Sequence, residues 1–354
     1  MKTDTVIEMN DPIVASRTEI MGLAILMIMF CHSKVVISNS YMAKWYDIVK
    51  NICQSGVDVF LFLSGMGCYY SMIRHRNILI FYKNRALRIF PVYMLIIPFR
   101  IMIDMIYDGY TWKDAVYRYS LVSFFMDGTL VTWFIAGILV LYLCFPVIYY
   151  ILKRNENAFL VFAALYLVCV CMIHHMSQNG IEIPGWLRRD VFYIRVLPFL
   201  TGAYYGKISR NDHGSLVKIL YEKANILIIM LAYFFCLCVY DIQYNTVDMW
   251  YILRLLFFPI SVLVITGSAF VINKTNKNTF LRFLGKMTLE LYLLHEWMLH
   301  IASKLLFQYM ERNFCTTVLL NILVFLWSIF LADLIHRFLG KSILRTIRPG
   351  WKNS

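Results

Sequence analysis

The chain of 354 residues contains little charge for its length. Asp, Glu, Lys and Arg together make up 16% of it, whereas hydrophobic residues make up 60% and the mean hydropathy is +0.63. A soluble domain of this size is about a quarter charged and about half apolar. The apolar excess is concentrated in long runs, which indicates that the protein lies in a membrane.

Signals of several other protein classes are missing. The first residues include Asp4, Glu8 and Asp11 and lack a positive segment followed by an apolar core, so no signal peptide is apparent. None of the nine cysteines has the spacing of zinc ligands, so we interpret them as packing residues and expect no metal. We find no internal repeat, no low-complexity segment and no loop long enough to be a second domain. Residues 1–354 are therefore expected to form a single integral-membrane domain.

Apolar runs of about 20 residues are long enough to cross a bilayer as helices. The sequence predicts an all-α polytopic membrane protein with ten such spans, at residues 19–38, 55–73, 87–107, 131–151, 157–175, 191–209, 224–241, 250–272, 287–305 and 316–337. The segment 112–126 is too short and too charged to cross, and we predict an interfacial helix there.

The distribution of basic residues predicts the orientation of these spans. The net charge is +13, and most of the 34 Lys and Arg residues fall in segments that a cytoplasmic N-terminus would leave inside. Cytoplasmic loops of membrane proteins carry such an excess of Lys and Arg. We therefore expect both termini to be cytoplasmic, and the positive charge needs no nucleic-acid partner.

Charged side chains within the predicted spans mark a candidate site, because such residues are costly in a bilayer and usually face a cavity. His32 stands out because it interrupts an otherwise apolar stretch. Counting along each span places seven residues at one depth in the outer half: His32, Asp58, Arg100, Asp104, Trp133, Arg195 and Arg254. Trp133 and Arg254 are equally well explained as interfacial anchors. Arg100 and Asp104 are four residues apart and are placed to pair on one helix face.

A second group of polar residues lies toward the cytoplasmic side. Arg85 and Arg88 would present two guanidinium groups on one helix face, which suits a phosphate as well as a lipid headgroup. The segment 284–300 contains Glu290, His295, Glu296 and His300; of these, Glu290 is expected at the inner interface, and His295 and Glu296 are not. Because neighbouring residues point about 100° apart on a helix, we expect at most one of His295 and Glu296 to face a given cavity.

Four stretches of the sequence together resemble a known family. They are GLAILMIMFCH in the first span, GVDVFLFLSGMG (56–67), YKNRALRIFPVY (82–93) and FLGKMTLELYLLH (283–295). Two others, TWFIAGILVLYLCFPVIY (132–149) and RVLPFLTGAYYG (195–206), fit more loosely. Their order and spacing resemble the acyltransferase-3 family of integral-membrane acyltransferases, many of which O-acetylate bacterial surface polysaccharides.

One position departs from the family pattern. Members of the family commonly have an Arg three helical turns before the histidine, where this chain has Met21. Arg17 lies one turn earlier and is the candidate substitute; alternatively, the site is altered or inactive. Glu19 stands where the family often has an acidic residue.

The resemblance implies that an acetyl group moves from cytoplasmic acetyl-CoA to a sugar hydroxyl of a surface polysaccharide or of its lipid-linked precursor. It also implies a multi-pass protein surrounded by the lipids of a bacterial inner (plasma) membrane, with acetyl-CoA as donor and no bound cofactor. His32 is the expected general base or acetyl carrier, and Asp58 the carboxylate that fixes its tautomer. The expected acyl-CoA-binding residues are Arg17, Arg85 and Arg88, and the expected acceptor-binding residues are Arg100, Trp133, Arg195 and Arg254.

Two alternatives fit the same residues. A transporter or flippase for a lipid-linked sugar would also carry charges inside membrane helices, although such proteins usually have internal repeats or broken half-helices. An acyltransferase with another donor, such as succinyl-CoA, or another acceptor, such as a lipid headgroup or a small metabolite, is the second alternative.

Overall fold

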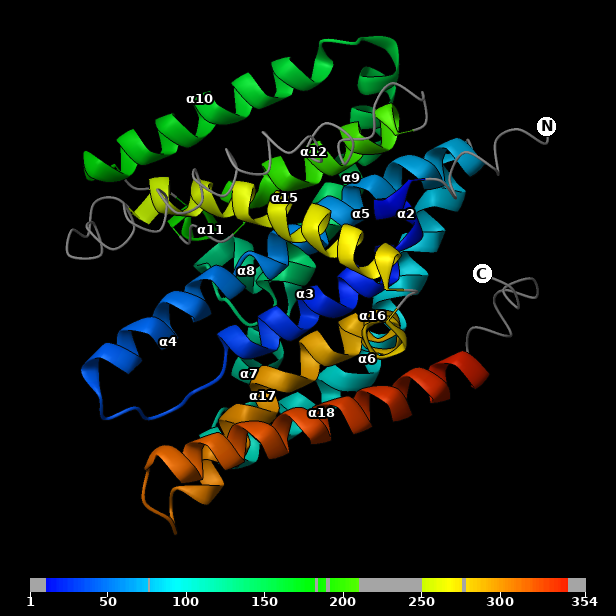
Figure 1. Ribbon diagram of the computed structural model, residues 1–354. Coiled ribbons are helices and arrows are strands. Elements are labelled where there is room, and N and C mark those ends of the chain that lie inside the picture. Colours follow the sequence, from blue (N-terminus) through cyan, green and yellow to red (C-terminus); the bar gives the residue numbers. More distant parts are fainter. Residues whose placement is uncertain are drawn as a thin grey trace.

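The computed structural model describes residues 11–75, 77–181, 184–188, 192–209, 250–275 and 278–342. Every regular element in these ranges is a helix, which confirms the all-α fold class for this part of the chain. The helices form one bundle in which α10 and α18 lie at opposite edges and α3 and α5 lie between them (Figure 1). The predicted span 224–241 lies outside the described residues.

The first half of the chain forms α2 (Pro12–Ala15), α3 (Arg17–Cys31), α4 (Ser40–Cys53), α5 (Gly56–His75), α6 (Ile78–Asp108), α7 (Trp112–Arg118), α8 (Leu121–Asp127) and α9 (Trp133–Arg154). The second half forms α10 (Ala158–Gln178), α11 (Gly185–Arg188), the 3-10 helix η1 (Tyr193–Arg195), α12 (Val196–Ile208), α15 (Trp250–Lys274), α16 (Thr279–Lys286), α17 (Thr288–Leu306) and α18 (Phe314–Ser342). The last turn of α18 and the short helix α2 lie on the same side of the bundle (Figure 1).

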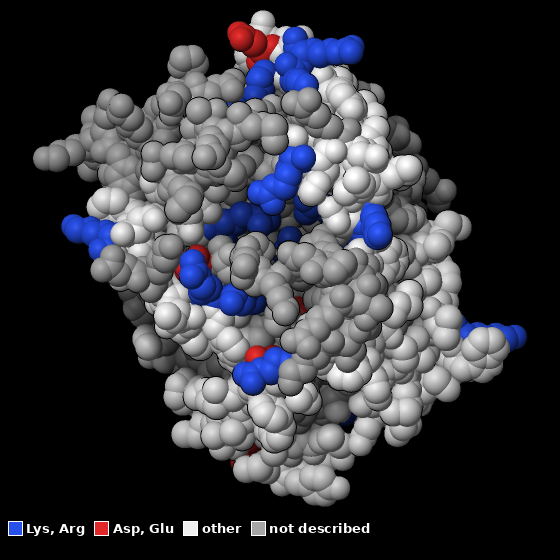
Figure 2. Space-filling model, turned by 90° about the vertical axis from the view of Figure 1, so that its right-hand side faces the viewer, with Lys and Arg blue, Asp and Glu red and all other residues white. Residues whose placement is uncertain are grey.

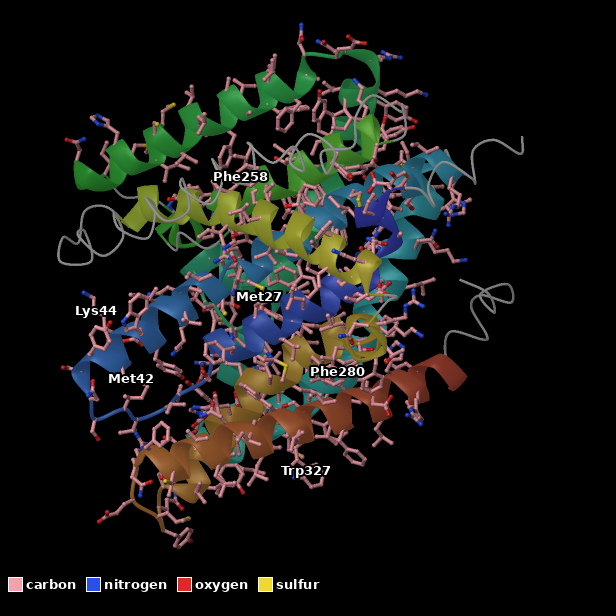
Figure 3. All side chains as sticks on the ribbon, in the orientation of Figure 1. Met27, Met42, Lys44, Phe258, Phe280 and Trp327 are labelled. Carbon is pink, nitrogen blue, oxygen red and sulfur yellow. The ribbon has the colours of Figure 1, made fainter. Side chains whose placement is uncertain are left out.

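Four stretches of the described residues are long and apolar enough to cross a membrane. They are Ser40–His75, which contains α4 and α5, and the helices Ile78–Asp108, Trp133–Arg154 and Phe314–Gly340. On α18, large apolar side chains such as Trp327 point away from the bundle, as expected for a surface that faces lipid (Figure 3). The chain is thus a helical membrane protein, while the count of ten spans stays a prediction.

The first predicted span is shorter than expected. α3 ends at Cys31, and residues 33–38 have no helical structure. The Ser33 hydroxyl donates to the Phe30 carbonyl (2.6 Å), and the Asn321 side chain of α18 bonds the backbone of Lys34. These side chains take over backbone bonding at the helix end, so the helix stops there. His32 is therefore the C-terminal cap of α3 and not a residue in the middle of a helix.

Two other boundaries differ because side chains cap the helices. α6 begins at Ile78, before the expected residue 87, since Asn77 accepts hydrogen bonds from the first backbone N–H groups of the helix. The segment expected as one interfacial helix, 112–126, is divided into α7 and α8, because the Ser120 side chain caps α8 by accepting from the Ser123 N–H. α4 lies between the predicted spans 19–38 and 55–73, where no helix was predicted.

Glycines let α5 and α12 pack with their backbones in contact. A Cβ added to Gly65 of α5 would lie 2.0 Å from the carbonyl oxygen of Phe199, and one added to Gly202 of α12 would lie 1.9 Å from the carbonyl oxygen of Phe62. No side chain fits at either position, so this pair of helices is rigidly joined.

The same reciprocal arrangement joins α3 to α16. A Cβ on Gly22 would lie 1.9 Å from the Leu281 carbonyl oxygen, and one on Gly285 would lie 1.8 Å from the Thr18 carbonyl oxygen. Gly285 belongs to the Gly-Lys pair of the stretch 283–295. Because Gly285 has no side chain, α16 packs directly against the backbone of α3. This contact fixes the position of α3, and with it the C-terminal end of α3, relative to the second half of the chain.

We predict that Gly202→Ala destabilises the protein by about 1–3 kcal/mol, because the added methyl group collides with the backbone of α5. The measurement is the temperature at which half of the detergent-solubilised protein is lost from the monodisperse peak after heating. Gly267→Ala on α15 is the control, since nothing lies within 4 Å of the added Cβ. Equal melting of the two variants would contradict the close packing of α5 and α12.

Candidate active site

Two histidines from opposite ends of the sequence meet inside the bundle. Nδ1 of His32, at the end of α3, lies 3.1 Å from Nε2 of His295 on α17, and the ring centroids are 5.0 Å apart. His295 is 1% exposed, whereas the side chain of His32 is 34% exposed. The pair therefore has one buried member and one member that solvent or a substrate can reach.

Backbone carbonyl groups determine which nitrogens carry protons. His295 Nδ1 lies 2.8 Å from the Leu291 carbonyl oxygen, so Nδ1 donates and Nε2 is an acceptor. His32 Nδ1 faces two acceptors, this Nε2 and the Ile28 carbonyl oxygen at 2.9 Å, so it carries the proton. The lone pair of neutral His32 is then on Nε2. The arrangement presents a base on the reachable side of the ring.

A carboxylate lies next to this base. Oε2 of Glu296 is 3.8 Å from Nε2 of His32, and its side chain is 67% exposed. Once Nε2 has taken a proton, the carboxylate stabilises the imidazolium ion. His295 and Glu296 thus contact different nitrogens of the His32 ring, and neither of them lines either of the two described cavities, so the expectation that at most one faces a given cavity stays a prediction. The long Glu296 side chain reaches His32 from the exposed side because His32 lies at a helix end.

Asp58 lies in a separate cluster. Its Oδ1 atom is 3.7 Å from Nη1 of Arg195, with both side chains buried. Arg195 also donates to the carbonyl oxygen of Gln54 (3.1 Å), and its guanidinium lies over the Trp133 ring, 5.6 Å from the centroid. The described contacts of His32 go to Ile28, His295, Glu296 and Cys31. The structure corrects the expectation that Asp58 fixes the His32 tautomer, because the buried Asp58 carboxylate is held by Arg195 instead.

Arg100 and Asp104 of α6 both contact α17, but they do so through different groups. Asp104 accepts hydrogen bonds from the Tyr119 hydroxyl and from the Trp297 indole N–H (3.1 Å). Arg100 donates to the Leu293 carbonyl oxygen (3.0 Å) and lies over the rings of Tyr119 and Trp297. The expected Arg100–Asp104 ion pair is thus replaced by a network with aromatic residues. Leu293 and Trp297 lie on either side of His295 in the sequence, so the network orients α17 toward His32.

The residues predicted to share one depth therefore form separate groups. His32, the Asp58 cluster and the Arg100 network are each organised around different partners. Arg254 belongs to α15, and its side chain lies outside the described residues. Depth along a span did not predict which residues meet.

Arginines gather at the other end of α3. The Arg17 guanidinium donates to the Leu63 carbonyl oxygen (3.3 and 3.2 Å) and lies against Gly67, whose carbonyl oxygen accepts from Arg85 (3.1 Å). No carboxylate of the described residues forms an ion pair with Arg17, Arg85 or Arg88. On this side of the bundle, Lys and Arg side chains surround a hollow (Figure 2). Unpaired guanidinium groups of this kind suit a phosphate-bearing ligand.

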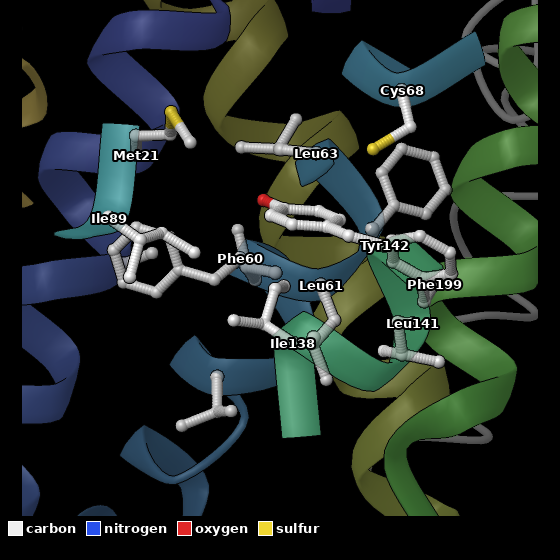
Figure 4. Close-up of a cluster of buried hydrophobic side chains, with 14 of the residues drawn as sticks. Met21, Phe60, Leu61, Leu63, Cys68, Ile89, Ile138, Leu141, Tyr142 and Phe199 are labelled. Atoms are coloured by element: carbon white, nitrogen blue, oxygen red, sulfur yellow. The ribbon is translucent and has the colours of Figure 1, made fainter. Parts of the chain in front are cut away.

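A small internal cavity of about 50 Å³ lies between the two sets of residues. Its mostly apolar lining includes Arg88 and also Ile28 and Tyr292, which adjoin the two histidines. Met21, which replaces the family arginine, is one wall, and the Tyr142 hydroxyl points toward the side where Met21 lies (Figure 4). Arg17 does not line this cavity and lies instead beside Arg85 at Gly67; we call Arg17, Arg85 and Arg88 the inner arginines. The cavity wall at Met21 is therefore apolar.

A family model described as an acyltransferase domain matches residues 22–337, nearly the whole chain. The chain belongs to the acyltransferase-3 family. The resemblance inferred from the four stretches is thereby confirmed, and the chain is a membrane acyltransferase. Comparison with curated proteins and with solved structures gave no match.

Within this acyltransferase, the site residues that sequence reasoning missed are His295 and Glu296. A signal for His295 was present, because it closes the stretch 283–295 that resembles the family. Glu296 follows it directly and was noted only as one of the polar residues of the segment 284–300. Its contact with His32 depends on how the ends of α3 and α17 meet.

We predict that Glu296→Gln lowers kcat about 10- to 100-fold and leaves KM for the acyl donor unchanged, since the carboxylate stabilises only the protonated form of His32. The measurement is the initial rate of acyl transfer in isolated membranes at several donor concentrations. Glu311→Gln, an exposed position beyond α17, is the matched control. An unchanged kcat for Glu296→Gln would show that the carboxylate takes no part.

Proposed function

We propose that this chain transfers an acetyl group from acetyl-CoA to a sugar hydroxyl of a surface polysaccharide or of its lipid-linked precursor. The observation that carries the proposal is the His32–His295 pair, whose hydrogen bonds leave Nε2 of His32 free to accept a proton. Transfer to a hydroxyl needs such a base, because the alcohol is a weak nucleophile until its proton is removed.

The proposed reaction is a direct transfer with His32 as general base. Nε2 of His32 takes the hydroxyl proton while the acceptor oxygen attacks the thioester carbonyl carbon. The new C–O bond forms, the C–S bond breaks, and CoA leaves as a thiolate that takes the proton back from His32. Glu296 stabilises the imidazolium ion between these steps, and the buried His295 keeps Nδ1 of His32 engaged.

The inner arginines support CoA as the donor. CoA carries several phosphate groups, and Arg17, Arg85 and Arg88 offer guanidinium groups that the described carboxylates do not neutralise. The small cavity lined by Arg88 and by Tyr292, which adjoins His295, lies on the route that the thioester would take from the arginines to His32. We assign no bound cofactor to this reaction.

We further propose that the arginine side faces the cytoplasm of a bacterial inner membrane and that the His32 side faces outward. This orientation is supported by the excess of Lys and Arg in the segments assigned to the cytoplasm. It is also supported by the position of α2 and the end of α18 on one side of the bundle. Acetyl-CoA would then enter from inside, and the carbohydrate would meet His32 outside.

We predict that His32→Ala lowers acetyl transfer by about 10²- to 10⁴-fold, because the variant lacks the general base of the proposed reaction. The measurement is transfer of labelled acetyl from acetyl-CoA in membranes, together with mass spectrometry of surface glycans from cells with and without the active protein. His75→Ala, an exposed position at the far end of α5, is the control. Full activity of a well-expressed His32→Ala variant would refute the mechanism.

We predict that Arg85→Gln raises KM for acetyl-CoA roughly tenfold with little change in kcat, because one phosphate contact made equally in ground and transition states is lost. Lys83→Gln removes the same charge from an exposed position on the same turn of α6 and should leave KM unchanged. Equal increases of KM in the two variants would mean that general surface charge, and not the guanidinium group of Arg85, attracts the donor.

A further inference from the structure

A second and larger cavity lies on the His32 side of the bundle. Its volume is about 480 Å³, within the range of roughly 300–1,000 Å³ typical of small-molecule sites. The walls are the segment 34–37, one face of α4, the end of α17 and the start of α18. The mechanism proposed above uses none of the residues that line it.

One wall of this cavity is held firmly in place. The Asn321 side chain accepts from the Lys34 N–H (3.1 Å) and donates to the Lys34 carbonyl oxygen (2.9 Å). The next contact along the segment is the Val36 N–H, which donates to the Thr317 hydroxyl (3.1 Å). A segment without helical structure is thus tied to α18 at both of these residues, so the cavity is preformed.

The lining of this cavity is strongly basic. It contains four Lys and Arg side chains, His300 and a single carboxylate, Asp47. Lys304 and His300 are partly neutralised by Asp108 of α6, at 2.8 and 3.4 Å. Among the described residues, no carboxylate pairs with the remaining three cations, which are Lys34, Lys50 and Arg312.

Aromatic rings hold two of these cations over the cavity. The Lys50 ammonium lies over the Tyr46 ring, 5.3 Å from the centroid, and the Arg312 guanidinium lies over the Phe307 ring at 4.8 Å. Cation–π contacts orient a charge without neutralising it. Their full positive charge therefore stays available to an anion in the cavity.

The cavity adjoins the candidate base through three short connections. Lys34 is two residues beyond His32, and the Ser33 hydroxyl between them lies 2.7 Å from the Tyr46 hydroxyl. On α17, His300 lies one turn, or about 6 Å of helix, beyond Glu296. A ligand anchored in the cavity would bring its next unit to His32.

We propose that this cavity binds the acidic group of the acceptor, so that the substrate is a saccharide that carries a carboxylate or phosphate on the unit next to the sugar that is acetylated. This inference rests on the proposed function, because it assigns the acceptor class of the same site. The anion lies among Lys34, Lys50 and Arg312, and the neighbouring sugar presents its hydroxyl to Nε2 of His32.

The test measures binding separately from catalysis. The full-length protein is placed in nanodiscs of neutral phosphatidylcholine, and fluorescence anisotropy follows a labelled hexamer of galacturonic acid. A labelled maltohexaose of the same length is the neutral probe. The acidic probe should bind with an affinity that falls as salt is added, and the neutral probe should bind at least about tenfold more weakly.

A charge-matched pair of variants locates the binding. Lys50→Gln with Arg312→Gln should weaken binding of the acidic probe roughly tenfold, as expected for the loss of two charge-assisted contacts. Lys44→Gln with Lys113→Gln removes the same charge elsewhere and should leave binding unchanged. Lys44 is on α4 but does not line the cavity, and it lies at the outer edge of the structure (Figure 3).

The possible outcomes separate this proposal from the proposed function. Equal binding of the two probes, or equal effects of the two double variants, would overturn the acidic acceptor and leave the His32 chemistry untouched. If anionic phosphatidylglycerol in the nanodiscs displaces the acidic probe completely, the cavity holds a lipid headgroup and the proposal fails. His32→Ala should bind the acidic probe normally, so its loss of transfer would report catalysis alone.

Discussion

The hydrogen bond between His32 and His295 is the contact on which the arrangement of the site depends. It joins the end of α3 to the middle of α17: the Nδ1–H of His32 faces both Nε2 of His295 and the Ile28 carbonyl oxygen, while Nδ1 of His295 donates to the Leu291 carbonyl oxygen. An unpaired imidazole buried in an apolar bundle would be costly. Here the buried ring is satisfied by Leu291 and His32, and the cost of burial is offset while the outer ring keeps a free nitrogen.

Other parts of the fold support this contact from two directions. The Arg100–Asp104 network braces α17 through Leu293 and Trp297, on either side of His295. The glycine contacts between α3 and α16 fix the opposite helix. Both sets of contacts involve backbone atoms or aromatic rings within the bundle, which move less than long exposed side chains. His32 is therefore held by rigid elements, as precise positioning of a reactive group would require.

The sequence predicted the long apolar helices well and the contacts between them poorly. The runs 131–151, 157–175 and 287–305 correspond closely to α9, α10 and α17, since apolar periodicity alone determines such helices. The C-terminal end of α3 and the start of α6 were mispredicted because hydrogen bonds of the Ser33 and Asn77 side chains determine where these helices end and begin. Capping depends on local geometry that a hydropathy count does not contain.

The depth of a polar residue along its predicted span does not show which side chains it contacts. His32 and Asp58 were correctly seen as unusual in apolar sequence, but counting residues along a span says nothing of the direction around the bundle axis. Asp58 faces Arg195, and His32 faces α17. Only the packing of the helices decides this, and the family resemblance of the stretch ending at His295 was the one sequence feature that pointed to the true partner.

The interlocked backbones of α3 and α16 also limit how far the inner cavity can change its shape. Because neither Gly22 nor Gly285 has space even for a methyl group beside it, the wall of the inner cavity formed by α3 cannot retreat to admit a larger group. The cavity of about 50 Å³ is much smaller than the engineered cavities of about 150 Å³ that hold a benzene molecule. Room for a larger group in this cavity would therefore have to come from smaller side chains elsewhere in its lining, at positions such as Ile138 and Phe60.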